Sequence, residues 1–281
     1  MGDSNPQPST TRRLVVNADD FGLSRSVNEA VIRAHREGIL TTASLMVNEP
    51  GFDEAVKLAK DNPMLGVGLH LTLLHGHSAL AHDKIPGLVN PRGEFSNSPV
   101  GVGMKYFFDS DLLDPLRAEI QAQFDKFRST GLVFDHINGH LHLHLHPVIF
   151  KILMDDSEKF DIRRLRFTRD CLARSWKMSK GYLFYRVSHA AIFDWLSSQA
   201  RETLKQKSIK HTQITFGLLQ DGRVDEDYVL KLLPELPPGD SELYSHPSLD
   251  KFRHEFEALI SPRVCEQVKK LGIQLIRYQD L

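Results

Sequence analysis

The segment Leu14-Val-Val-Asn-Ala-Asp-Asp-Phe-Gly-Leu-Ser24 decides the fold class that we predict for this chain. It opens with the short apolar run Leu14–Val16 and then changes abruptly to the polar residues Asn17, Asp19 and Asp20. A short continuous apolar run followed by polar residues is typical of a strand buried in a parallel sheet. We therefore expect a buried strand whose carboxyl end carries two adjacent carboxylates.

Strand and helix patterns alternate through the rest of the chain. Further strands are expected at Thr42–Val47, Leu65–Leu73, Val133–Asn138, Arg164–Phe167, Gln213–Phe216, Glu242–Ser245 and Gln274–Arg277. Helices are expected at Val27–Glu37, Phe52–Lys60, Leu112–Ser129, Pro147–Glu158, Tyr182–Lys207, Tyr228–Leu233 and Phe252–Leu271. Such alternation indicates βα units and a parallel sheet, and a β/α barrel typically has about 250 residues. We predict one α/β domain, a TIM-like barrel, over residues 12–281.

Two segments stand outside this alternation. Residues 1–11 are polar and contain no apolar run, so we expect a disordered leader rather than a signal peptide or membrane anchor. Gly76–Val102 is rich in Gly, Pro, Asn and Ser, which predicts a long loop or a small insertion. Long loops at the catalytic end of a barrel often cover the substrate.

The composition excludes several classes of protein. The 281 residues include 35 Lys and Arg against 36 Asp and Glu, a formal net charge of −1. This balance gives no electrostatic support for nucleic-acid binding, and no stretch approaches the roughly 20 apolar residues of a transmembrane helix. Cys171 and Cys265 are too isolated for a disulfide framework or a thiolate zinc site. We expect a cytoplasmic protein, and a homodimer is our working assumption for its assembly.

Polar residues follow or end several of the predicted strands. They are Asp19 and Asp20, His70, His140, Arg166 or Arg169, and His246. The carboxyl ends of the strands meet at one face of a β/α barrel, so residues distant in sequence converge there. One carboxylate and two imidazoles suit a divalent metal that keeps open positions for water. A second carboxylate nearby can then act as a general base.

Histidine and leucine alternate in the segment His140-Leu-His-Leu-His-Leu-His146. At strand spacing, His140, His142, His144 and His146 would line one side of the strand and the leucines the other. This tract predicts contact with a metal or with substrate. Not all four imidazoles can be metal ligands, because other strands contribute donors and a catalytic metal needs vacant positions.

Several motifs resemble those of the YdjC-like (ChbG-type) carbohydrate deacetylases. They are Val16-Asn-Ala-Asp-Asp-Phe-Gly-Leu-Ser24, Asn28-Glu-Ala30, Gly38-Ile-Leu-Thr-Thr-Ala-Ser44, Gly68-Leu-His-Leu71 and His136-Ile-Asn-Gly-His140. Other segments resemble the branch associated with hopanoid biosynthesis (HpnK-like), which is thought to deacetylate an N-acetylglucosaminyl hopanoid. These are His35-Arg-Glu-Gly-Ile-Leu40, Lys105-Tyr-Phe-Phe108, Ala118-Glu-Ile-Gln-Ala-Gln-Phe124 and the histidine tract.

The resemblance implies a distorted β/α barrel, a divalent metal and a role for each strand-end residue. It places the metal ligands at Asp20, His70 and His140, the general base at Asp19 and the general acid at His246. It implies that Arg166 and Arg169 orient Asp19 or the substrate, while His142 and His144 keep an open role in substrate binding or in supporting the metal. The sequence departs from some relatives at Asn138-Gly139, where those carry Asp-Ser, and this affects support for the metal.

We therefore predict a metal-dependent hydrolase that removes an N-acetyl group from an amino sugar, either a chito-oligosaccharide or an N-acetylglucosaminyl lipid. A carboxylate with two imidazoles favours Zn²⁺, Mn²⁺, Co²⁺ or Ni²⁺ over Mg²⁺, which relatives are often assigned. Two alternatives remain open at this point. One is a metal-dependent phosphoesterase on the same barrel, and the other is a non-catalytic glycan-binding barrel.

Overall fold

The computed structural model describes residues 11–170 and 183–281. Their strands form one parallel sheet in the order β4-β3-β2-β1-β6-β5, and β7 pairs with β1 beside this path. The strands are β1 (Arg12–Phe21), β2 (Thr42–Leu45), β3 (Gly66–Leu71), β4 (Phe134–Gly139), β5 (Ile214–Phe216), β6 (Gly239–Ser245) and β7 (Gln274–Ile276). The predicted α/β domain with a parallel sheet is confirmed. The expected leader, up to residue 10, and also Cys171 and Tyr182, lie outside the described residues.

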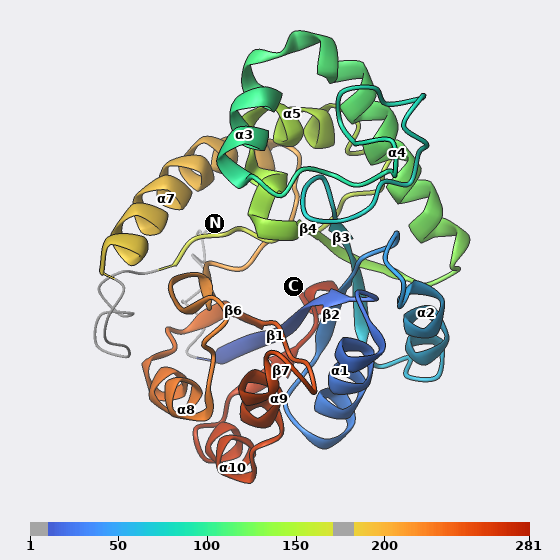
Figure 1. Cartoon of the computed structure of the whole chain (residues 1–281). Helices are drawn as coiled ribbons and strands as arrows, with labels where there is room; N and C mark the ends of the chain where they lie inside the picture. Colours follow the sequence, from blue (N-terminus) through green and yellow to red (C-terminus); the bar gives the residue numbers. More distant parts are fainter. Residues whose placement is uncertain (1–10, 171–182) are drawn as a thin grey trace, which may run out of the picture.

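Helices surround the sheet (Figure 1). They are α1 (Arg25–Glu37), α2 (Phe52–Lys60), α3 (Pro99–Phe108), α4 (Leu113–Ser129), α5 (Pro147–Asp155), α7 (Leu183–Gln206), α8 (Glu226–Glu235), α9 (Arg253–Ile260) and α10 (Pro262–Lys270). Short 3-10 turns occur at η1 (Ser110–Leu112), η2 (His140–Leu145), η3 (Leu218–Gln220) and η4 (Tyr278–Asp280). Among the described residues, no helix combines the length and the apolar character needed to cross a membrane.

The sheet curls into a partial barrel. We predicted a regular strand at Arg164–Phe167, but this segment makes only isolated parallel bridges, from Leu165 to Ile137 and from Arg164 to Lys210. Each side of the segment meets its partner at a single residue pair, so no continuous ladder of hydrogen bonds forms. The segment therefore spans the interval between β4 and β5 without forming a further regular strand of a closed ring.

A bulge in β1 positions the two adjacent carboxylates. The pairing with β2 joins Ala18 to Ala43 and Phe21 to Leu45, so three steps along β1 oppose two along β2. Successive side chains of a regular strand point to opposite faces, whereas a bulge redirects them. Asp20 lies inside this bulge with a φ of 62°, and the irregular backbone allows it to reach the same cavity as Asp19.

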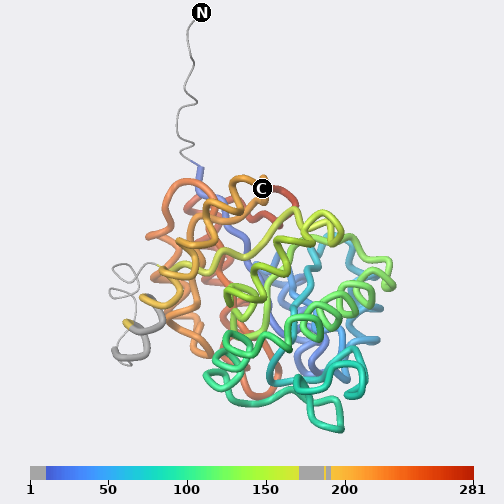
Figure 2. Tube along the Cα trace, turned by 90° about the horizontal axis from the view of Figure 1, so that it is seen from above, coloured from blue at the N-terminus to red at the C-terminus, as the bar shows by residue number. Residues whose placement is uncertain are grey.

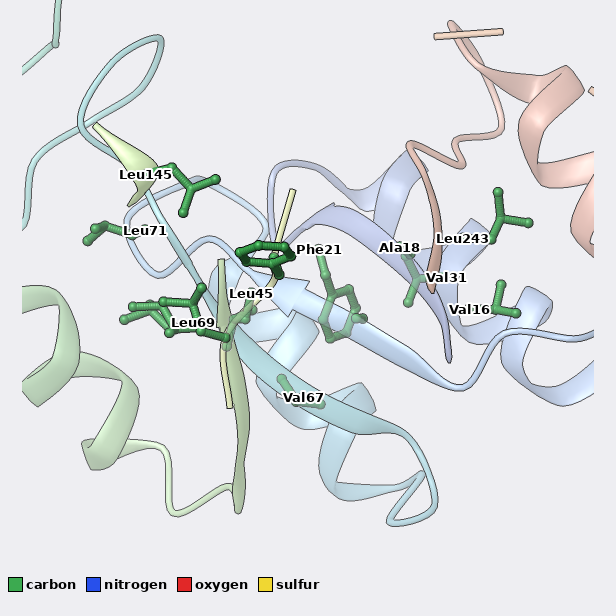
Figure 3. Packing of buried hydrophobic residues seen from close by; sticks show 14 of the residues in the cluster. Val16, Ala18, Phe21, Val31, Leu45, Val67, Leu69, Leu71, Leu145 and Leu243 are labelled. Carbon is green, nitrogen blue, oxygen red and sulfur yellow. The ribbon is translucent and has the colours of Figure 1, made fainter. Parts of the chain in front are cut away.

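The buried hydrophobic residues form a main cluster that extends from Leu14 to Ile273. Figure 3 shows Val16, Ala18 and Leu243 packed close to Val31 of α1. Both faces of the central strands are covered, which explains why β2 and β3 are buried along their full lengths. In Figure 2 the C-terminus and the start of β1 (blue) lie at one end of the molecule, and the teal segment before α3 lies at the other.

The histidine tract does not continue β4 as a strand. The pairing of β3 with β4 ends where Leu71 meets Gly139, and Pro147 begins α5 soon afterwards. The chain turns within this short interval, with φ values of 49° at Leu141 and 58° at His142. The four imidazoles therefore point to different partners instead of lining one side, and the expectation of strand spacing was wrong.

The predicted helix Phe252–Leu271 is divided into α9 and α10. Ser261 separates them with a non-helical ψ of 126°, and Pro262 begins α10. A proline disfavours helical geometry in the residue before it but is well suited to the first turn of a new helix. Ser261 then accepts a hydrogen bond from the backbone of Val264 and caps α10.

The segment predicted as a long loop, Gly76–Val102, contains the start of α3 at Pro99. The loop before α3 is anchored by the buried carboxylate of Glu119 on α4. Its two oxygens accept backbone hydrogen bonds from Ala79 at 2.8 Å and Leu80 at 3.0 Å. The loop therefore has a fixed attachment to the helix layer.

Gly38 permits close contact between the end of α1 and α9. A Cβ atom at Gly38 would lie 2.1 Å from the backbone oxygen of Leu259. We expect Gly38→Ala to lower the free energy of unfolding by about 1–3 kcal/mol, because backbone must move to relieve the overlap. Gly103→Ala is the control, since its Cβ would meet only a His146 carbon at 4.0 Å. Urea denaturation of both variants tests this, and equal stabilities would contradict it.

Candidate functional site

Asp19 is held at the carboxyl end of β1 by a buried arginine. Arg166 donates to both carboxylate oxygens, with Nη1 2.6 Å from Oδ2 and Nη2 2.8 Å from Oδ1. Asn17 and Asn138 also donate to Oδ1, at 2.8 and 3.1 Å. Burial by itself would raise the pKa of Asp19, but Arg166 and His70 outweigh it and hold this pKa below its ordinary value. Asp19 is therefore ionised at neutral pH.

Arg166 is itself fully buried and is balanced by a second carboxylate. Its Nη2 lies 2.8 Å from Glu242 Oε1 on β6, and Glu242 Oε2 accepts a hydrogen bond from the Tyr278 hydroxyl at 2.5 Å. A buried cation is tolerated when opposite charges and hydrogen bonds satisfy it. Glu242 and Tyr278 therefore fix the guanidinium that in turn fixes Asp19.

Asp20, His70 and His140 meet beside Asp19. Asp20 Oδ1 lies 3.3 Å from His70 Nε2 and 3.0 Å from His140 Nδ1. The two imidazole nitrogens are 3.3 Å apart, and one donor atom from each residue lies within 4.8 Å of the others. No other such group of histidine, cysteine or acidic side chains occurs within residues 11–170 and 183–281.

Asn138 gives His70 the orientation of a metal ligand. Its Oδ1 lies 2.7 Å from His70 Nδ1, and an amide oxygen can only accept, so Nδ1 carries the proton. The Nε2 lone pair is then directed toward Asp20 and His140. Histidine ligands usually donate their second nitrogen to such a partner, so the donor set and its support both fit a divalent cation. Asn138 stands at the position where the sequence departs from some relatives.

His246 follows β6, on the other side of β1 from β2, β3 and β4. Its Nδ1 lies 3.6 Å from Asp221 Oδ1 and 3.9 Å from Glu255 Oε2. Burial disfavours the charged imidazolium, but Asp221, Asp20 and Glu255 outweigh it and raise the pKa of His246 to about 9. His246 is therefore protonated at neutral pH.

Asp19, Asp20, His140 and His246 open onto one cavity of about 550 Å³. Further lining residues come from the loops that follow β1, β2, β3 and β6: Leu23, Val27, Met46, Glu49, His75, Ser248, Lys251 and Phe252. A cavity of this size can hold a small ligand. It combines an ionised carboxylate, a protonated imidazole and a cluster of metal donors.

Comparison with known proteins assigns the fold and family. Residues 13–270 match the sequence profile of the family described as YdjC-like protein. The chain belongs to the YdjC-like family. A carbohydrate deacetylase from Geobacillus stearothermophilus is 29% identical over 270 residues, which cover 96% of this chain and 98% of that protein. A chitooligosaccharide deacetylase from Proteus mirabilis is 37% identical over 149 residues, 52% of this chain and 55% of that protein.

A solved structure from Enterococcus faecalis V583, provisionally described as a cellobiose-phosphate cleavage protein, shares the fold of this YdjC-like chain. The two superpose with a TM-score of 0.72 at 23% identity, covering 96% of this chain and 98% of the other. At this level of identity the likeness concerns the fold alone.

Two of the four predicted supporting residues lie away from the cavity lining of this YdjC-like protein. Arg169 pairs with Asp194 of α7 at the surface, with 2.8 Å between Nε and Oδ1, whereas Arg166 alone of the two arginines holds Asp19. His144 is buried, and its Nε2 lies 3.0 Å from the backbone oxygen of Arg166, so it supports the segment that carries this arginine.

His142 is also buried beneath the cavity. Its Nε2 lies 2.9 Å from the Tyr244 hydroxyl. Burial and the nearby Arg166 lower the pKa of His142 well below its ordinary value. It is therefore a neutral imidazole that accepts and donates hydrogen bonds.

Sequence reasoning missed Asn17, Asn138, Glu242 and Asp221 as parts of the YdjC-like site. Asn138 lies inside a quoted motif, and Glu242 is an acidic residue in a predicted buried strand, so both carried a signal. A charge in a buried strand requires a partner. Asp221 follows the turn η3 and gave no comparable signal.

Replacing Arg166 should destabilise the YdjC-like fold far more than replacing Arg169. Arg166→Gln leaves Asp19 and Glu242 buried without their cation, which should cost about 3–5 kcal/mol of unfolding free energy. Arg169→Gln removes an exposed pair, worth at most about 1 kcal/mol. Urea denaturation at pH 7 measures both variants, and similar losses would show that the buried charge cluster does not carry this stability.

The His246 imidazole should titrate near pH 9 in metal-free protein. An unfolded histidine has a pKa of about 6.5, so the stabilisation from its ion pairs is complete below that pH and is lost as the pH rises through about 9. Asp221→Asn should move the titration of His246 to lower pH. NMR of the histidine ring protons follows both, and a midpoint near 6.5 in the unsubstituted protein would refute the assignment.

Proposed function

We propose that this protein is a metal-dependent hydrolase that removes the N-acetyl group from an N-acetylated amino sugar. One observation carries the proposal: ionised Asp19, protonated His246 and the donors of Asp20 and His140 open onto the same cavity. Membership of the YdjC-like family and the deacetylase relatives support it.

Asp20, His70 and His140 are the residues that would hold one divalent ion. Two imidazoles beside a single carboxylate favour Zn²⁺, Mn²⁺, Co²⁺ or Ni²⁺ over Mg²⁺, which prefers oxygen donors. Such an ion polarises a carbonyl and increases the acidity of water when it is bound. Three protein donors leave room for water and substrate.

Asp19 acts as the general base in this proposal. Its Oδ1 receives hydrogen bonds from Asn17, Asn138 and Arg166, while Oδ2 receives one from Arg166. A carboxylate oxygen has two acceptor positions, so Oδ2 keeps one position for the proton of an attacking water. The surrounding donors fix the direction of that position, and water transfers its proton there as it attacks the acetamide carbon.

His246 acts as the general acid. Its Nδ1 faces Asp221 and Glu255, so Nε2 is the nitrogen available to the cavity. As the C–N bond breaks, Nε2 transfers its proton to the departing nitrogen, because an amine anion is a poor leaving group. The products are acetate and a free amino sugar.

The finer substrate is either a chito-oligosaccharide or an N-acetylglucosaminyl lipid such as a hopanoid. The name of the Proteus mirabilis relative supports the first of these. The second would place apolar groups near the mouth of the site, where α3 carries the exposed rings of Phe107 and Phe108. Both substrates present the same acetamide to the site.

Acetate release from chito-oligosaccharides and a synthetic N-acetylglucosaminyl lipid, with and without Zn²⁺, Mn²⁺, Co²⁺, Ni²⁺ or Mg²⁺, tests the proposal. We expect release that is abolished by chelation and restored by a transition metal or zinc. Asp19→Asn should lower kcat by roughly 10²–10⁴-fold, because it removes the base. Asp53→Asn, on the exposed first turn of α2, is the matched control.

Other outcomes of the same assay would favour the two alternative functions. Phosphate release from an aryl phosphate without any acetate release would indicate a phosphoesterase. Binding of chito-oligosaccharide by metal-loaded protein, with no turnover, would indicate a glycan-binding barrel and contradict the proposed hydrolase.

A further inference from the structure

A row of buried polar side chains links the histidine tract to His246. His142 Nε2 lies 2.9 Å from the Tyr244 hydroxyl, and that hydroxyl lies 3.5 Å from Asp221 Oδ1. Asp221 Oδ1 is in turn 3.6 Å from His246 Nδ1. At the opposite end, the Thr168 hydroxyl lies 3.5 Å from His142 Nδ1. The row thus joins elements that are distant in sequence.

Hydrogen-bonding rules give this row a direction. Tyr244 has one hydroxyl proton, and an ionised Asp221 can only accept. If Tyr244 gave its proton to His142, an oxygen lone pair would face the Asp221 carboxylate. The favourable arrangement is therefore donation from His142 Nε2–H to Tyr244 and from Tyr244 to Asp221. Thr168 then donates to the unprotonated Nδ1 of His142.

The backbone and packing around these residues are specialised for the row. His142 has a φ of 58° directly after Leu141 at 49°, a region that side chains rarely adopt and that costs of order 1 kcal/mol or more per residue. Tyr244 and His246 lie two positions apart at the end of β6, so they share one side of the strand. The ring of Tyr244 packs against the Arg166 guanidinium, 4.5 Å from its centroid.

We infer that Tyr244 and His142 are positioning residues that act through Asp221 to hold His246 in the orientation required of a general acid. This inference rests on the proposed function and assigns a role to a histidine of the tract that does not bind metal. Donation from Tyr244 fixes the Asp221 carboxylate, and the carboxylate fixes the imidazole through Nδ1. The proton on Nε2 is thereby directed at the nitrogen that leaves when the C–N bond breaks.

A comparison of leaving groups isolates this role. An amine needs a proton to leave, whereas the p-nitrophenolate of p-nitrophenyl acetate leaves without one. We expect Tyr244→Phe to lower kcat for chito-oligosaccharide deacetylation by about tenfold, part of the 10²–10⁴-fold that a general acid contributes. KM and the hydrolysis of p-nitrophenyl acetate by the metal-loaded enzyme should change less than twofold.

Tyr106→Phe is the matched control for the loss of a buried hydroxyl. Tyr106 is buried like Tyr244, but its hydroxyl donates to the backbone oxygen of Leu73 at 2.8 Å. Equal kinetics of the two tyrosine variants would overturn the inference. A loss in Tyr244→Phe that is the same for amide and ester would also overturn it, because it would indicate a general structural role.

Two variants at His142 test the other end of the row. The side-chain amide of glutamine can replace the Nε2 donor, whereas leucine cannot. We expect His142→Leu to reproduce the selective loss of Tyr244→Phe and His142→Gln to recover at least part of it. Equal losses in the two variants would remove His142 from the proposed row.

A spectroscopic measurement separates this inference from the proposed function. The ¹⁵N resonances of the His246 ring, recorded in metal-free protein, report its hydrogen bonding without any turnover. A change in these resonances in Tyr244→Phe, but not in Tyr106→Phe, would support the link even if no acetylated sugar were hydrolysed. Unchanged resonances would overturn the link, whereas absence of turnover alone would overturn only the deacetylase assignment.

Discussion

The buried guanidinium of Arg166 is the constraint on which the arrangement of the site depends. It has no exposure to solvent, so its charge must be balanced by carboxylates within the protein. Asp19 on β1 and Glu242 on β6 supply them, and Tyr278 completes the cluster from the C-terminal turn. Three distant parts of the chain must therefore be in place together before Asp19 acquires its fixed orientation.

The bulge in β1 gives two neighbouring carboxylates different environments. Asp19 is surrounded by donors and contacts Arg166, whereas Asp20 faces His70 and His140. In a regular strand the two side chains would point to opposite faces. The extra residue, with the positive φ of Asp20, lets both reach one cavity, one as a metal donor and one beside it.

Opposite electrostatic environments on the two sides of the cavity suit acid–base chemistry. The cation of Arg166 lowers the pKa of Asp19, and Asp221, Asp20 and Glu255 raise that of His246 to about 9. At neutral pH the usual base of the pair is ionised and the acid keeps its proton. Environments that separate two pKa values in this way are how one site maintains both a base and an acid.

The sequence by itself determined the parallel α/β class and the residues at the strand ends, because apolar periodicity and abrupt polar ends are local properties. It selected Asp19, Asp20, His70, His140 and His246 before their meeting was visible. Only the tertiary structure decided the curled sheet and the turn of the histidine tract, since each depends on partners available from distant strands. The same holds for the separate fates of Arg166 and Arg169. Arg166 became a buried ion-pair centre and Arg169 a surface partner because Glu242 and Asp19 lie in the interior, whereas Asp194 lies on α7.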